Sequence, residues 1–87
     1  MNLQLFVSGM TQKSMVAISN IRRICDDYLG DCFELEIIDI YKNPKAARDN
    51  QVVFSPSLVK NFPLPKKTLI GTFDDSTKVI KALGITV

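Results

Sequence analysis

The hydrophobic positions in the first part of the chain change from a two-residue spacing to a helical one. Apolar and polar residues alternate over residues 3–7, which predicts a strand that residues 8–11 break. Apolar side chains then recur every three or four positions over residues 14–29, which predicts a helix ending at Gly30. The buried side of this helix is expected to carry Ala17, Ile18, Ile21, Ile24, Cys25 and Tyr28.

A second strand is expected over residues 34–40. Its first half alternates, whereas residues 37–40 are apolar on both faces, which is typical of a central parallel strand covered on both sides. Asn43 and Pro44 then signal a helix start, because asparagine caps helices and proline is favoured in the first turn. We expect this short helix to continue through Arg48.

Prolines interrupt the second half of the chain. Residues 52–59 have a strand-like pattern, but Pro56 has no N–H to donate, so we expect it at a strand start, an edge or a bend. Residues 68–73 are expected to form the next strand. Residues 74–77 can cap a last helix over residues 78–83.

Together these elements predict one α/β domain over residues 1–87 with the order β-α-β-α-β-β-α. The first two strands are joined by a helix, so they should be parallel with a right-handed crossover. The last two strands can pair in antiparallel orientation. This is the thioredoxin-like arrangement.

Composition and charge exclude several classes of function. The 87 residues include 11 Lys and Arg against 9 Asp and Glu, which is too small an excess to indicate nucleic acid binding. The one local basic group comprises Lys60, Lys66 and Lys67, and we expect these side chains in a solvated loop. No apolar run approaches the roughly 20 residues that span a bilayer, and the start lacks a signal-peptide pattern. The spacing of Cys25 and Cys32 does not fit a secreted disulfide framework, so a cytoplasmic location is expected.

Catalytic chemistry has no residues to support it. A thioredoxin-type redox site places its cysteines at the start of the first helix, where the helix dipole lowers a thiol pKa. Residues 8–14 contain no cysteine, so Cys25 and Cys32 are expected to be buried or half-buried inert thiols. Two cysteines without histidine make a poor zinc site, and Asp39 is interpreted as a capped or salt-bridged surface aspartate. We expect no catalytic residue, metal or cofactor.

Several segments resemble the KaiB family, and together they span nearly the whole chain. Residues 5–9 and 14–24 are similar to the start of KaiB proteins, and residues 37–44 and 54–60 continue the resemblance. The later matching segments are residues 62–67 and 69–71. The specific part is the spacing of Asp39, Lys42, Asn43, Pro44, Pro56, Pro63, Pro65 and Gly71.

The resemblance implies a non-catalytic regulatory protein whose partner is a KaiC-type hexameric ATPase, in circadian-type timing or stress regulation. It also implies homodimers or homotetramers. KaiB proteins are known for changing fold: the form that binds KaiC is thioredoxin-like, and a resting form has the order β-α-β-β-α-α-β. The helical pattern of residues 78–83 favours the first form. The residues expected to define the loops or the fold state are Pro56, Pro63, Pro65, Gly71 and Asp75.

Glu34 and Glu36 depart from the family pattern, because clock members tend to carry small or basic residues there for partner contact. We expect these two residues and Lys42 to contact the partner of this chain. A reversed charge would oppose a partner surface that evolved for positive charge. The sequence therefore does not favour KaiA as a partner.

Two other functions stay open at this point. One is a thiol oxidoreductase that retains the thioredoxin scaffold and uses Cys25 and Cys32. The other is an interaction module resembling the sensor region of a clock kinase.

Overall fold

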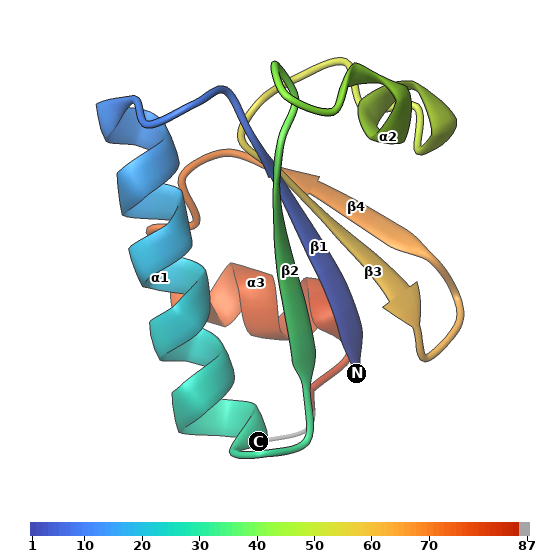
Figure 1. The fold of residues 1–87 in the computed structure, drawn as a ribbon. Helices are drawn as coiled ribbons and strands as arrows, with labels where there is room; N and C mark the ends of the chain where they lie inside the picture. Colours follow the sequence, from blue (N-terminus) through green and yellow to red (C-terminus); the bar gives the residue numbers. More distant parts are fainter. Residues whose placement is uncertain (86–87) are drawn as a thin grey trace.

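A four-stranded mixed sheet forms the middle of the protein, whose residues 1–85 are described by a computed structural model (Figure 1). The strand order β2-β1-β3-β4 places the N-terminal strand inside the sheet. It pairs in parallel with β2 and antiparallel with β3, and β4 is antiparallel to β3. The strands are β1 (Asn2–Val7), β2 (Glu34–Asp39), β3 (Ser57–Phe62) and β4 (Lys67–Ile70).

Two helices, α1 (Gln12–Leu29) and α3 (Ser76–Leu83), pack on one face of the sheet. The short α2 (Pro44–Asp49) covers only one end of the opposite face (Figure 1). The expected thioredoxin-like order β-α-β-α-β-β-α is confirmed, and the alternative order β-α-β-β-α-α-β is not the one adopted. No helix within residues 1–85 has both the length and the apolar character needed to cross a bilayer.

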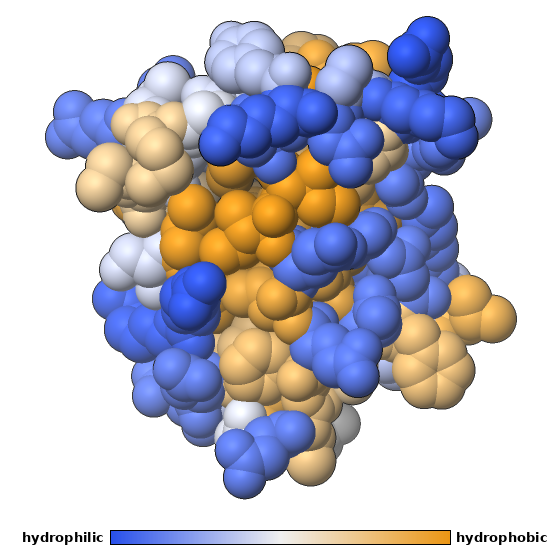
Figure 2. Space-filling model, in the orientation of Figure 1, coloured by the Kyte–Doolittle hydropathy of each residue, from blue (hydrophilic) through white to orange (hydrophobic). Residues whose placement is uncertain are grey.

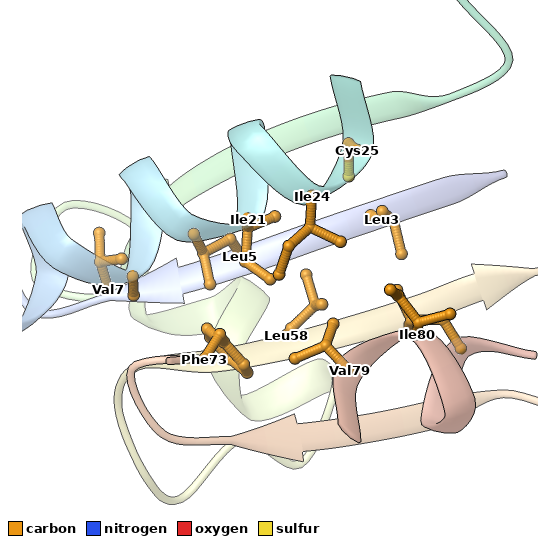
Figure 3. Packing of buried hydrophobic residues seen from close by; sticks show 12 residues of the cluster. Leu3, Leu5, Val7, Ile21, Ile24, Cys25, Leu58, Phe73, Val79 and Ile80 are labelled. Atoms are coloured by element: carbon orange, nitrogen blue, oxygen red, sulfur yellow. The ribbon is translucent and has the colours of Figure 1, made fainter. Parts of the chain in front are cut away.

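The main core lies between the sheet and the α1–α3 layer (Figure 3). The alternation predicted for the first strand is confirmed, because Leu3, Leu5 and Val7 are at most 2% exposed. They meet Ile21 and Ile24, which are both buried on the inward side of α1. Removal of this apolar surface from water is the largest favourable contribution to folding.

β2 is an edge strand, not the central strand that its pattern indicated. The helix α2 explains the apolar second half, because Ile38 packs beneath it with Phe6, Ala47 and Val59. The first half of β2 has no such cover, and both of its glutamates are exposed. Half a strand covered by a short helix therefore has the same pattern as a covered central strand.

The antiparallel pairing of the last two strands is confirmed, but their bounds differ from the expected ones. β3 begins directly after Pro56, and residues 52–56 form no strand, so this proline stands at a strand start. β4 ends at Ile70. Phe73, expected in the strand, instead has a φ of 63° and turns into the core with 7% exposure.

Two side chains lie where the sequence did not predict them. Tyr28 is 41% exposed and lines an open hollow beside α3 instead of joining the buried side of α1. Lys60, expected in a solvated loop, is 4% exposed. The reason is that β3 continues to Phe62, so that Lys60 points from the strand into the helix-covered side of the sheet.

Candidate partner-binding surface

The turn between β1 and α1 is the place where a redox-active thioredoxin would hold its thiols, and here it is built from hydroxyls. Thr11 caps α1 by accepting a hydrogen bond from the Ser14 N–H through Oγ1, at 3.2 Å. The Ser14 hydroxyl accepts in turn from the Ser8 N–H at 3.3 Å. These groups satisfy the helix start internally, which stabilises the turn and supplies no activated nucleophile.

The two cysteines are free and lie in different environments. Cys25 is buried in the main core, and burial, together with the negative charge of Asp26, raises the pKa of its thiol to about 11. It is therefore a protonated thiol at neutral pH and a poor nucleophile. Cys32 is exposed, which corrects the expectation that both thiols are at least half-buried.

Asp39 connects the ends of the two parallel strands. Its Oδ1 accepts hydrogen bonds from the Gly9 N–H at 3.2 Å and the Tyr41 N–H at 2.9 Å. Asp39 is thus half-buried and hydrogen-bonded to the backbone, and within residues 1–85 it forms no salt bridge. This turn leaves Met10 and Tyr41 each 75% exposed at the same end of the sheet.

Glu34 and Glu36 lie on the uncovered half of the sheet, where amide side chains hold them. Asn2 Nδ2 donates to Glu34 Oε2 at 3.4 Å, and Gln4 Nε2 donates to Glu36 Oε1 at 3.0 Å. Asn61 Nδ2 extends the network by donating to Gln4 Oε1 at 2.9 Å. This polar ladder (Asn2, Gln4, Glu34, Glu36 and Asn61) crosses three strands, and neither glutamate has a cationic partner within residues 1–85.

Lys42 lies beyond the other end of β2, in the exposed turn that leads to α2. Its backbone N–H donates to the Asp39 carbonyl at 3.1 Å, so the turn is ordered while the ammonium group faces solvent. The three residues predicted to contact a partner therefore lie along one edge of the molecule but not in one cluster.

The residues predicted to define the loops fall in three places. Pro56 is buried, and its carbonyl accepts from the Gly71 N–H at 3.1 Å, which joins the loops before β3 and after β4. Pro63 and Pro65 are exposed in the β3–β4 turn; like Pro56, each follows a cis peptide bond. Asp75 caps α3, because its Oδ1 accepts from the Thr77 and Lys78 N–H groups.

Apolar side chains gather in two regions of the surface. Figure 2 shows an apolar strip between α1 and the sheet. The partly buried residues of these two elements that pack on the core are Ile18 and Leu29 of α1 and Leu35 and Ile37 of β2. The second region comprises the end of β3 and the β3–β4 turn, where Phe62 is 64% and Leu64 is 75% exposed. Exposed apolar groups of this kind commonly mark interaction sites. Within residues 1–85 no three His, Cys, Asp or Glu side chains are arranged to hold a metal ion.

Comparison with known proteins shows which sequences and structures this chain is similar to. The family model of the KaiB domain matches residues 4–85. The Circadian clock protein KaiB3 of Synechocystis is 37% identical over 83 residues, with 95% of this chain and 81% of the relative covered. The Circadian clock oscillator protein KaiB of Synechococcus elongatus is 32% identical over 83 residues with the same coverage.

Solved structures show the same fold at lower identity. The N-terminal domain of Synechococcus elongatus SasA superposes with a TM-score of 0.78 at 23% identity, covering 95% of this chain and 82% of that domain. Thioredoxin 1 of Thermosipho africanus gives a TM-score of 0.76 at 18% identity, covering 97% and 91%. The fold is thus shared with thioredoxins, whereas the sequence match over nearly the whole length is specific: the chain belongs to the KaiB family.

Proposed function

We propose that this chain is a non-catalytic regulatory protein that binds a KaiC-type hexameric ATPase in circadian-type timing or stress regulation. The observation that carries this proposal is the KaiB domain match over residues 4–85. Membership of the family supports a clock regulatory role, and the KaiC-type ATPase as partner is proposed in addition. A cytoplasmic location is part of the same proposal.

The environment of the thiols supports a binding role over redox catalysis. The start of α1 offers the hydroxyls of Thr11 and Ser14 where a thiolate would be needed, and both are engaged in the helix cap. Cys25 is held protonated by burial. The start of α1 and Cys25 therefore both lack a reactive thiol. This favours a function in which the protein binds a partner through its surface.

The proposed contact surface is the edge formed by α1 and β2. One side of β2 has no neighbouring strand in the described sheet, so its backbone N–H and C=O groups are free for a partner. The apolar strip beside it supplies surface to bury, and Glu34, Glu36 and Lys42 supply charges that select the partner. The partner face is expected to be basic opposite the two glutamates.

The test is to mix the purified protein with a KaiC homologue from the same genome, with ATP and long incubation, and to measure co-migration by size-exclusion chromatography. A complex is expected. If none forms, the proposed partner is wrong.

Charge-reversal variants test the surface separately from the partner. Glu34→Lys/Glu36→Lys should weaken the complex by about tenfold or more, because it places like charges opposite one another. Lys78→Glu, which reverses the charge of an exposed residue on α3, outside this edge, is the control and should bind like the unchanged protein. Equal affinity of all three would leave the partner in place but refute the contact surface.

The likeness to the SasA N-terminal domain favours a second candidate at the level of fold, the sensor-like interaction module considered from the sequence. A genome that encodes a neighbouring kinase and no KaiC homologue would favour this candidate over the first.

We also propose that the protein self-associates through the β3–β4 turn. Phe62 is exposed beside Lys66 and Lys67, and it also lines an open hollow of about 500 Å³ whose wall includes Asp31 and Glu34. Figure 2 shows an apolar projection on the side of the molecule where this turn lies. A basic apolar turn beside an acidic hollow is self-complementary about a two-fold axis, since each copy offers both halves.

Sedimentation equilibrium tests this contact. Leu64→Ser should shift the protein toward monomer, whereas Ile70→Ser removes a similarly exposed apolar side chain from β4 and should not. An unchanged protein that stays monomeric at all concentrations contradicts self-association.

A further inference from the structure

Lys60 is a buried cation without a carboxylate partner. Its side chain is 4% exposed, while the only ion pair within residues 1–85 joins Lys45 and Asp49 on the surface. Burial of an ammonium group is costly unless a polar group compensates it, so the position needs a physical explanation. Packing alone does not provide one, because an apolar side chain would fill the same space at lower cost.

The compensating group is the C-terminal end of α3. Lys60 Nζ donates a hydrogen bond to the carbonyl oxygen of Leu83, the last residue of that helix, at 3.2 Å. The partial negative charge at a helix C-terminus attracts a cation, and a hydrogen bond from a charged donor is stronger than a neutral one. Lys60 therefore bonds β3 to the end of α3.

The backbone after α3 bonds to other carbonyls of the last turn, so Lys60 is the group that bonds to the carbonyl of Leu83. Gly84 follows α3 with a φ of 74°, and the N–H groups of Gly84 and Ile85 bond to the carbonyls of Lys81 and Ile80. Those bonds satisfy two of the last-turn carbonyls, and Lys60 satisfies that of Leu83. A Cβ placed on Gly84 would lie 4.0 Å from Lys60 Nζ, so the ammonium group sits directly against the helix cap.

The nearest charge that the strand pairing gives to Lys60 has its own sign, because Lys67 lies opposite it in the β3–β4 register. Within residues 1–85 no carboxylate forms an ion pair with Lys60. No side-chain anion thus takes the place of the helix end, and the cation has one described acceptor.

We propose that Lys60 is a latch that fixes α3 on the sheet, so that its loss lets α3 open as a local unit while the rest of the domain stays folded. The apolar contribution of α3 is small, since Val79, Ile80 and Leu83 are its buried residues. An element with few buried side chains opens at lower free energy than the central strands. Lys60 would act in this way whatever the partner of the protein.

Native-state hydrogen exchange measured by NMR on the full chain tests the latch. Lys60→Met keeps a long side chain but removes the charge and the donor, so the α3 amides should exchange about 10- to 100-fold faster. The amides of β1, at the centre of the sheet, should still exchange more slowly than those of α3, because α3 opens while the rest of the domain stays folded. Lys60→Arg retains charge and donors and should restore most of the protection of α3.

Two results would overturn the latch: α3 amides that exchange equally fast in the unchanged protein and in Lys60→Met, or α3 and β1 amides that open with the same free energy in Lys60→Met. The second result would show that α3 opens only together with the whole domain. If Lys60→Met does not fold, Lys60→Gln, which keeps a neutral donor, takes its place with the same two criteria. Failure of Lys60→Arg to protect α3 better than the neutral variant also contradicts the charge-assisted bond.

Discussion

Asp75 offers a direct measure of how much the α3 cap contributes to stability. Its Oδ1 accepts hydrogen bonds from the Thr77 N–H at 3.1 Å and the Lys78 N–H at 3.3 Å, two of the groups that a helix start leaves unpaired. Replacing an N-cap aspartate by alanine typically costs about 1 kcal/mol, and loss of a negative charge near the helix N-terminus adds about 0.3–1 kcal/mol. We therefore expect Asp75→Ala to lower the free energy of unfolding by about 1–2 kcal/mol.

Urea unfolding followed by circular dichroism measures this change. For a domain of this size, about 1 kcal/mol corresponds to a melting temperature lower by roughly 4–8 °C. Asp75→Asn keeps the accepting oxygen without the charge, so it should recover most of the loss. Asp75→Ala and Asp75→Asn that unfold alike would show that the charge, not the capping bond, is the main contribution. An Asp75→Ala variant as stable as the unchanged protein would refute the reasoning about the cap altogether.

Three further predictions follow from burial and backbone geometry. Folding raises the pKa of Cys25 from 9.0 to about 11, so the folded state holds this proton at pH values where the unfolded state has lost it. The free energy of unfolding should therefore fall as pH rises from 9 to 11. Urea titrations at several pH values should show a smaller fall for Cys25→Ala. Leu5→Ala, at a fully buried position, should cost about 2–5 kcal/mol of unfolding free energy, against little change for Val53→Ala at an 81% exposed position. Gly9→Ala should cost roughly 1–2 kcal/mol, because Gly9 has a φ of 66°, and a melting temperature equal to that of the unchanged protein would contradict it.

The fold was predictable where a short sequence pattern was enough to determine a helix start or a strand. Asn43 with Pro44 marks the start of α2, and the alternating residues of β1 all point into the core. Lys60 was placed wrongly because the neighbouring prolines suggested a loop, while the strand continues to Phe62 and ends only before Pro63. A lysine aimed at a helix end leaves no local pattern, since its partner is 23 residues away.

The position of β2 shows the same limit for the sheet. Apolar residues on both faces of a strand indicate that both faces are covered. They do not show whether the strand is central in the sheet or is an edge strand covered by a short helix such as α2. Glu34 and Glu36 lie on this edge strand and Lys42 lies just beyond its end, and their contact with a partner stays a prediction. The exposure of Phe62 and Leu64 was not predicted, because the identity of an apolar residue at a strand end or in a turn does not show whether it is buried.

The partial cover of the sheet by α2 divides each central strand into two stretches under different constraints. Beneath α2, Phe6 and Val59 are 0% exposed and any change in their volume alters packing. A few residues away, the polar ladder is part of no apolar cluster, so the sign of its charges can change at little cost in stability. Recognition can therefore diverge among relatives while the fold stays constant, and two proteins with superimposable backbones can select opposite partners.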